Sequence, residues 1–374
     1  MSGLHDLLAD LVAIDSVNPD LVPGGAGEEA IARFVADWLE EAGLDVQIQE
    51  AAPGRLNVIG VAAGTGGGCS LLLNAHMDTV SLDGVDGPLE PRIEQNRMYG
   101  RGAYDMKAGL AAIMWAGAEA ARNPRRGDVI VTGVCDEEFA SVGAQALAAA
   151  WSADGAIVTE PTGAQLRLAV AHKGFSWHEI EVLGRAAHGS RPDEGIDAIA
   201  RMGRVLCLIE TLQDDLESRE PHPLLGRGSI HASLIEGGRE LSTYPARCVL
   251  RLERRTLPGE DTQRVESELQ AILDRLRDDD PTFEATHRTT LVRPPLETSL
   301  DEPIARASLA ALGDVDVIGV AFWADSALIA ASGVPTVIFG PGGEGAHADV
   351  EWVDLAQLDR CAEALTAVID SFCG

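Results

Sequence analysis

Residues 71–80 have the sequence LLLNAHMDTV, in which three leucines lead directly into Asn74, His76 and Asp78. A short apolar run that ends in a His-x-Asp pattern is typical of a buried strand whose last residues present polar side chains at the edge of a sheet. Three later apolar runs also end in a carboxylate or an imidazole: VIVTGVCDEE (129–138), AIVTEP (156–161) and TVIFGPGGEGAH (336–347). The sequence therefore predicts several strand ends that supply polar side chains to one site.

The composition is that of an acidic globular protein. A chain of 374 residues is long enough for two domains, and 46% hydrophobic against 24% charged residues supports a sizeable core. The formal net charge of -30 argues against nucleic acid or an anionic membrane as a partner, because few cationic side chains are available to displace counterions from phosphates.

The expected cellular location follows from the N-terminal segment, the lengths of the apolar runs and the spacing of the cysteines. No apolar run reaches the length of a membrane span, and the acidic N-terminal segment lacks the basic start of a signal peptide. The six cysteines show no C-x-x-C spacing, so we expect buried thiols in a reducing compartment. A cytoplasmic location is the expectation.

The order of predicted elements indicates two domains. Up to residue 174, and again from about residue 291, apolar strands alternate with helices, apart from an irregular excursion at residues 88–99. That alternation is typical of a doubly wound α/β sheet with ligands at the carboxyl ends of its strands. Residues 175–290 change to half-exposed strands and long helices, an α+β order. We expect a discontinuous catalytic domain, residues 1–174 and 291–374, with a smaller domain of residues 175–290 inserted into it.

Five residues at predicted strand ends and loops are candidate metal ligands. Two imidazoles and three carboxylates exceed the three protein ligands of one catalytic zinc, so the set suits two ions with one bridging carboxylate. Nitrogen and oxygen donors without thiolate favour zinc, manganese or cobalt. Each residue alone has a simpler explanation, a hydrogen-bonded histidine or a solvated acidic turn, but their recurrence at successive strand ends favours a metal centre. The five are His76, Asp105, Glu138, Glu160 and His347.

Six motifs resemble, in chain order, those of the M20 metallopeptidase family. They are HMDTV, GRGAYDMKAGLAA, CDEE, TEP, GRAAHGSRPDEGIDAI and GPGGEGAHADVEWV, and the resemblance extends over nearly the whole chain. The family includes acetylornithine deacetylase, succinyl-diaminopimelate desuccinylase, aminoacylase and glutamate-releasing carboxypeptidases. The resemblance implies a mixed-sheet catalytic domain with a di-metal site, and an inserted α+β domain that acts as a lid and forms a homodimer.

The resemblance also implies a role for each residue of the site. Glu137 would be the general base that takes a proton from metal-activated water as it attacks an amide carbonyl. Asp78 would hold a metal-bound histidine in the correct tautomer. A cis peptide bond is implied after the bridging residue. By motif position, His76 and Glu160 would bind one metal, Glu138 and His347 the other, and Asp105 would bridge the two.

In the inserted domain the resemblance implies two substrate contacts, and a third candidate, Ser242, departs from the family's pattern. His188 would donate to the oxyanion of the tetrahedral intermediate, in some members across a dimer interface, after domain closure. Arg255 would bind the substrate carboxylate through its planar guanidinium, with Arg254 as the alternative. Ser242 stands where many members have an asparagine, so this departure leaves the precise specificity open.

These expectations describe a di-zinc amidohydrolase, with cobalt or manganese as alternative metals, that removes the acyl group from an N-acyl amino acid. A metallo-dipeptidase or carboxypeptidase of the same family is the alternative, since its leaving group is also an amino acid. An inactive metal-binding or small-molecule-binding module belongs to another class, and the complete set of ligands and base argues against it. The chain lacks G-x-S-x-G and a strand-linked G-x-G-x-x-G, which argues against a serine hydrolase and a dinucleotide-binding enzyme.

Overall fold

In the computed structural model, which describes residues 3–374, strand β3 (Leu71–His76) lies inside the large sheet and all six of its residues are buried. It runs parallel to β6 (Val129–Val134) on one side and to β7 (Gly155–Val158) on the other. A parallel strand covered on both faces is apolar almost throughout, which explains the leucine run. The three strands point the same way, so the residues that follow them emerge at one edge of the sheet.

The large sheet is mixed. Among the described residues it has nine strands, in the order β1-β2-β6-β3-β7-β15-β8-β13, with β14 paired to β8. The pairs β1–β2, β2–β6 and β15–β8 are antiparallel, whereas β15 runs parallel to β7. The strands not yet located are β1 (Asp45–Ala52), β2 (Arg55–Ala62), β8 (Leu168–His172), β13 (Leu296–Glu297), β14 (Val317–Val320) and β15 (Thr336–Ile338).

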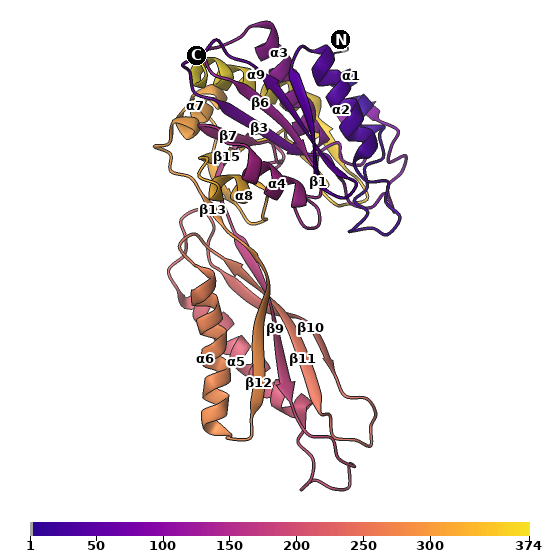
Figure 1. Cartoon of the computed structure of the whole chain (residues 1–374), viewed down its shortest axis with the longest axis vertical. Helices are drawn as coiled ribbons and strands as arrows, with labels where there is room; N and C mark the ends of the chain where they lie inside the picture. Colours follow the sequence, from indigo (N-terminus) through magenta and orange to yellow (C-terminus); the bar gives the residue numbers. More distant parts are fainter. Residues whose placement is uncertain (1–2) are drawn as a thin grey trace. The chain divides into compact units, whose positions relative to one another are not determined.

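Helices cover both faces of this sheet, as expected for a doubly wound fold (Figure 1). Helix α3 (Lys107–Arg122) packs on β3 and β6 and contacts α9 (Leu355–Phe372), while α4 (Val142–Ala150) and α8 (Ser326–Ala331) pack together on the opposite face. No described helix is long and apolar enough to cross a membrane. The remaining helices of this part of the chain are α1 (Leu4–Val12), α2 (Glu29–Glu41) and α7 (Pro303–Leu312).

A glycine allows α3 to begin directly beside a strand end. A Cβ atom at Gly109 would lie 2.4 Å from the carbonyl oxygen of Thr159, closer than any side chain permits. The helix therefore approaches the end of β7 only because this position has no side chain. The first turn of α3 and the residue after Thr159 are thereby brought to the same place.

A small antiparallel sheet joins two loops that are distant in sequence. Its order is β16-β17-β5-β4. The segment at residues 88–99, expected to be irregular, contains two of its strands; each is three residues long, too short to show a periodic pattern. Pairing of β17 with β5 joins the segment that contains His347 to the one that leads to Asp105. The strands are β4 (Arg92–Glu94), β5 (Arg97–Tyr99), β16 (Gly343–Glu344) and β17 (Trp352–Asp354).

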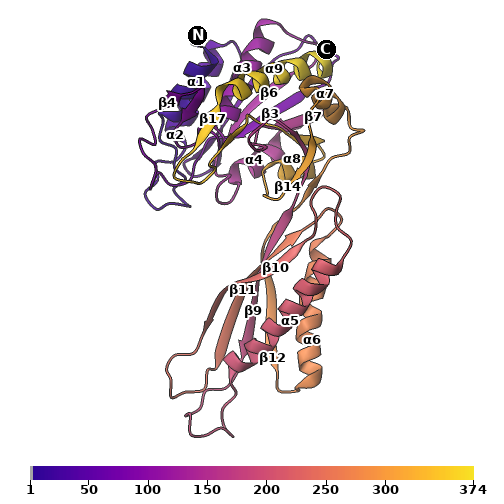
Figure 2. The same cartoon turned by 180° about the vertical axis from the view of Figure 1, so that it is seen from behind.

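The inserted part of the chain is a four-stranded antiparallel sheet in the order β10-β11-β9-β12, with α5 (Ala198–Ser218) and α6 (Thr262–Asp279) packed on one face (Figure 2). Alternate residues of its strands, such as Ile180 and Leu250, face the helices in a common core. The sequence did not predict β10, because seven of its nine residues are exposed and show no inward and outward alternation. The strands are β9 (Gly174–Leu183), β10 (Ser229–Gly237), β11 (Arg247–Thr256) and β12 (Glu284–Arg293).

By compactness the chain divides into a large unit and an inserted unit. The inserted unit comprises His172–Leu296 and Val320–Trp323, and the large unit comprises the rest. The tetrapeptide Val320–Trp323, which the sequence assigned to the catalytic domain, groups with the inserted unit for a clear reason. Trp323 Nε1 donates a hydrogen bond to the Pro294 carbonyl oxygen at 3.0 Å, and its ring packs edge-on against Phe175.

Candidate metal centre

The strand ends and loops of the large unit bring all five predicted ligands together. His76 is the last residue of β3, Glu160 follows β7, and Glu138 follows β6. Asp105 directly precedes α3, and His347 lies between β16 and β17. The side chains come from five separate places in the chain, so the candidate centre exists only in the folded large unit.

Asp105 lies between the two histidines. Its Oδ1 is 3.4 Å from Nε2 of His76, and its Oδ2 is 3.4 Å from Nε2 of His347. Glu160 Oε1 lies 3.8 Å from His76 Nε2, and Glu138 Oε2 lies 3.1 Å from His347 Nε2. The five side chains thus form two groups that share Asp105, and each group has one imidazole and one further carboxylate.

The donor atoms of this centre fit divalent metal ions. His76, Asp105 and Glu138 offer ligand atoms within 4.8 Å of one another, and so do His76, Glu137 and Glu160. One imidazole with two carboxylates in each set is the chemistry of zinc, manganese or cobalt centres, not of a structural thiolate site. The second set includes Glu137, which the sequence predicts as the base; its carboxylate therefore lies beside the group that contains His76 and Glu160.

In the protein alone, burial and neighbouring charges shift the pKa values of the carboxylates and imidazoles of this centre. Burial raises the pKa of Glu160 to about 8 and raises that of Glu137 well above its usual range, and the charge of Asp325 acts in the same direction on both. Hydrogen bonds with Asp105 and Glu138 raise the pKa of His347 to about 10. The pKa of His76 also lies well above its usual range: burial opposes the rise, but Asp105 and neighbouring carboxylates outweigh it. Bound cations would supply the positive charge that these carboxylates need.

Asp78 orients the loop that follows β6. Its buried carboxylate accepts the backbone N–H of Glu137 at 3.1 Å and that of Glu138 at 3.2 Å. Nδ1 of His76 lies 2.9 Å from the backbone oxygen of Asp78 and 3.6 Å from its Oδ1. A carbonyl oxygen only accepts, so in the neutral ring Nδ1 carries the proton and Nε2 presents its lone pair to the centre. Asp78, the predicted partner of His76, thus makes its closest contact with that ring through its main-chain oxygen and not through its carboxylate.

Glu351 organises the loop that carries Asp105, and the sequence analysis did not identify it. Its Oε1 accepts the backbone N–H groups of Tyr104 and Asp105, both at 2.9 Å. Its Oε2 accepts the N–H of Gly102 at 3.0 Å and Nη1 of Arg101 at 2.8 Å. The Asp105-Met106 peptide bond in this loop is cis, as the resemblance implied. The sequence signal that could have identified Glu351 is that an acidic residue stands between Val350 and Trp352, next to an apolar strand.

His188 and Ser242 lie side by side at one end of the inserted unit, and Arg255 lies at the other. The N–H of Gly189 donates to the Ser242 carbonyl oxygen at 2.7 Å, beside a bridge between His188 and Thr243. Arg255 instead pairs with Phe175 near the start of β9, whereas His188 follows the end of that strand. Since a strand rises about 3.3 Å per residue, the ten residues of β9 separate the two places by roughly 30 Å. One chain does not bring His188 and Arg255 together.

The two candidate arginines differ in accessibility. Arg254 is fully buried, and its Nη2 lies 2.7 Å from Oε1 of Glu260. The Arg255 side chain is 33% exposed, with its guanidinium 5.1 Å from the centre of the Phe175 ring and its Nε 2.6 Å from Oε1 of Glu253. Of the two, Arg255 is the one that a ligand can reach.

Residues 72–371 match Peptidase family M20/M25/M40. The chain belongs to this family. It is accordingly a hydrolase that acts on amide or peptide bonds, with an M20 fold. The chain is similar to an acetylornithine deacetylase of Myxococcus xanthus, with 30% identity over 100% of this chain and 98% of that protein.

Solved structures share the M20 fold at lower sequence identity. Aminopeptidase PepT from Bacillus cereus superimposes with a TM-score of 0.81 and 19% identity, over 99% of this chain and 98% of that one. The YXEP protein of Bacillus subtilis, described as a dinuclear metal-binding peptidase of the M20 family, gives a TM-score of 0.77 and 16% identity over 99% and 98%. These likenesses extend along the whole chain and concern its fold.

Proposed function

We propose that this M20 chain is a di-zinc deacylase that removes the acyl group from an N-acyl amino acid. The observation that carries the proposal is the position of Asp105, whose two carboxylate oxygens face His76 and His347, each joined by one further glutamate. The full-length similarity to an acetylornithine deacetylase supports a deacylase over the metallo-dipeptidase and carboxypeptidase alternatives.

Five residues would hold the two ions. One zinc would be bound by His76 and Glu160, the other by Glu138 and His347, with Asp105 as the bridge; cobalt or manganese would suit the same donors. When bound, such ions would polarise the amide carbonyl and lower the pKa of a water molecule from its value in bulk towards ~7. The hydrogen bond between Nδ1 of His76 and the backbone oxygen of Asp78 leaves Nε2 available, and Nε2 would bind the first ion.

Glu137 carries the proton transfers in this proposal. Its carboxylate lies within 4.8 Å of ligand atoms of His76 and Glu160, and Asp78 fixes its backbone N–H. The side chain takes a proton from the attacking water and then delivers it to the leaving amine, which is a poor leaving group unless protonated. Arg255, the accessible arginine, binds the carboxylate of the leaving amino acid. Ser242 lies beside His188 at the other end of the inserted unit, so it contributes its hydroxyl to the substrate of the partner subunit.

The proposed active form is a homodimer through the inserted unit. His188 and Arg255 of one chain lie at opposite ends of β9, so both contact one small substrate only if they come from different subunits. His188 of one subunit would then stabilise the oxyanion in the site of the other. Edge strand β10 exposes Leu234 (58%) and Ile235 (53%), which supports this unit as the interface, since apolar edge strands favour pairing with another chain.

A cytoplasmic location is part of the same proposal. All six cysteines are free thiols, and four of them are buried. Reduced cysteines are the rule in the cytoplasm, whereas exported proteins commonly pair them. Periplasmic activity in fractionated cells, with little in the cytoplasmic fraction, would contradict this part of the proposal.

A substrate panel tests the function. The protein, loaded with zinc, cobalt or manganese, is assayed on N-acetylornithine, other N-acetyl and N-succinyl amino acids, dipeptides and tripeptides. The highest kcat/KM on an N-acyl amino acid supports the deacylase, whereas a clear preference for peptides assigns the chain to the peptidase alternative. Elemental analysis is expected to give two divalent ions per chain at saturation, and fewer in His347→Ala. Full activity in metal-free protein would contradict the proposal.

A further inference from the structure

Two buried carboxylates, those of Glu28 and Asp78, accept hydrogen bonds from the loop that carries Glu137 and Glu138. Three consecutive backbone N–H groups donate to them: that of Asp136 to Oε1 of Glu28 at 3.2 Å, and those of Glu137 and Glu138 to Asp78 at 3.1 and 3.2 Å. Asp136 itself has a left-handed backbone with a φ of 68°, a conformation that is uncommon for residues other than glycine. The direction in which Glu137 leaves the main chain is thus fixed by groups outside the loop.

Arg55 connects these groups. Its Nε donates to Oε2 of Glu28 at 2.8 Å, and its Nη2 binds both Oε1 of Glu28 and Oδ1 of Asp136, the latter at 3.1 Å. The side-chain amide of Asn18 completes the network, because it donates to Asp78 at 2.7 Å and to Asp136 at 3.0 Å. Continuous hydrogen bonds therefore lead from Arg55 to the backbone of Glu138.

The Glu28–Arg55 pair is poorly explained by stability alone. Glu28 is fully buried and Arg55 is 6% exposed. A buried ion pair commonly recovers little more than its own desolvation cost, so its contribution to folding is small compared with its geometric effect. A planar guanidinium held by three carboxylates, those of Asp20, Glu28 and Asp136, has one orientation, and its contacts hold the peptide group of Asp136 in place.

We propose that Glu28 and Arg55 are positioning residues for catalysis: as a pair they fix the Asp136 peptide and thereby aim the carboxylate of Glu137. Neither residue touches substrate in this proposal, and both act through the backbone. The inference rests on the proposed role of Glu137 as the base. A misplacement of the order of 1 Å in a catalytic group costs up to about 10²-fold in rate.

The chain offers a matched control one residue away. Glu29 begins α2 and pairs with Arg33 on the surface, where the two side chains are 64% and 68% exposed. Glu28→Gln removes the charge from the buried pair, and Glu29→Gln removes it from the exposed one. We expect Glu28→Gln to lower kcat by about 10- to 100-fold with unchanged KM and unchanged metal content, and Glu29→Gln to match the wild type.

A second readout does not depend on activity. Amide hydrogen exchange of residues 136–138 in the native protein is expected to accelerate by about tenfold in Glu28→Gln, without faster exchange in the strands β3 and β7. Arg55→Lys keeps the positive charge but loses the bidentate contact with Glu28. Its kcat and the amide exchange rate of residues 136–138 are therefore expected to lie between those of wild type and Arg55→Gln.

The outcomes separate this inference from the proposed function. If the wild type hydrolyses an N-acyl amino acid and Glu28→Gln keeps its kcat, the positioning role is wrong and the proposed function stands. If metal content, KM and global protection change together with kcat, the pair is merely structural and the inference is overturned. If the wild type hydrolyses none of the panel, the proposed function fails, and unchanged exchange at residues 136–138 would overturn the inference separately.

Discussion

Glu351 accepts the backbone N–H of Asp105 at 2.9 Å, although the two residues are 246 positions apart in the chain. The Glu351 carboxylate takes four hydrogen bonds in all, three from the backbone of the Asp105 loop and one from Arg101. The residue that faces both histidines is therefore oriented by a carboxylate from the C-terminal part of the chain.

The first prediction concerns this carboxylate. In Glu351→Gln one acceptor oxygen becomes an NH₂ group, so two buried donors lose their acceptor: either two backbone N–H groups, or one backbone N–H and Nη1 of Arg101. We expect a loss of about 3–5 kcal/mol in the free energy of unfolding and weaker metal binding. Urea unfolding and elemental analysis measure the two effects. Glu344→Gln, an exposed change on β16, is the control and should stay within about 0.5 kcal/mol of wild type; equal unfolding curves for both variants would contradict the prediction.

The second prediction tests Glu137 as the base. Glu137→Gln keeps the size of the side chain but removes the group that accepts a proton. Turnover should fall by about 10²- to 10⁴-fold. The two metal ions should remain, since Glu137 is not among the five proposed ligands. Activity near that of the wild type would refute the mechanism, and loss of one ion would reassign Glu137 as a ligand.

The third prediction addresses the roughly 30 Å between His188 and Arg255 in one chain. His188→Ala and Glu137→Gln should each be nearly inactive as purified proteins. If His188 acts in the site of the partner, subunit exchange between the two variants creates hybrids in which one of two sites has both groups. Statistical mixing should then recover about a quarter of wild-type activity. No recovery, with hybrids verified by mass spectrometry, would mean that His188 acts within its own chain or not at all.

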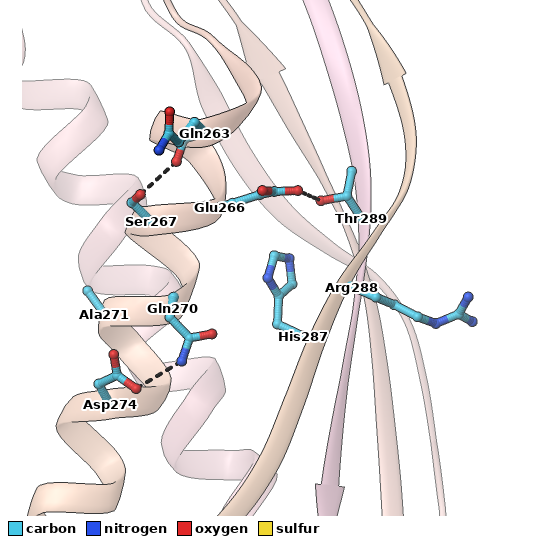
Figure 3. A pocket seen from close by; sticks show the side chains of 9 residues that line it. All are labelled: Gln263, Glu266, Ser267, Gln270, Ala271, Asp274, His287, Arg288 and Thr289. Carbon is cyan, nitrogen blue, oxygen red and sulfur yellow. Dashed lines mark hydrogen bonds between the residues drawn. The ribbon is translucent and has the colours of Figure 1, made fainter.

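The fourth prediction concerns acid stability of the inserted unit. Nδ1 of His178 lies 3.0 Å from Nε2 of His287, and Nε2 of His178 lies 2.7 Å from Oγ of Ser176. Figure 3 shows His287 beside Glu266 and Thr289, between α6 and β12. These residues line a hollow of about 560 Å³. Burial and the neighbouring His287 lower the pKa of His178 to about 4; Glu266 opposes this shift and Arg254 adds to it.

The sign of the effect follows from the two pKa values. An unfolded histidine has a pKa of about 6.5, so between pH 6.5 and pH 4 the unfolded chain binds the extra proton and the folded chain does not. Stability should fall as the pH is lowered through this window. Unfolding midpoints in urea at pH 7, 6 and 5 should decline less steeply in His178→Gln than in wild type, whereas His231→Gln, an exposed change, should follow the wild type. Parallel slopes for wild type and His178→Gln would contradict the prediction.

The sequence predicted the ligand-bearing strand ends because parallel strands in a covered sheet have a simple signature. Each needs a continuous apolar run, and its first polar residues appear at the carboxyl edge, so His76, Glu138 and Glu160 could be identified together. Glu351 and Arg55 could not, because a buried polar contact between distant segments leaves no periodic pattern. Their roles depend on which loops meet, and β4, β5 and β17, which join two of those loops, are only three residues long.

Two ambiguities needed the three-dimensional structure. Adjacent residues of a strand face opposite sides of the sheet, so Arg254 points into the core and Arg255 points away from it. Because both residues are charged, the sequence does not indicate which of the two faces the core. Motif similarity likewise assigned roles to His188 and Arg255 without indicating that β9 separates them.

The inserted unit leaves the large sheet after β8 and returns at β13, and these two strands are neighbours in that sheet. The N–H of Thr298 donates to the Val170 carbonyl oxygen at 2.8 Å, so the points of departure and return are about one strand spacing apart. A turn of a few residues would bridge the same gap. Residues 173–295 are therefore one insertion between two neighbouring strands, and a change in their length or sequence leaves the order of the strands that carry the candidate ligands unchanged.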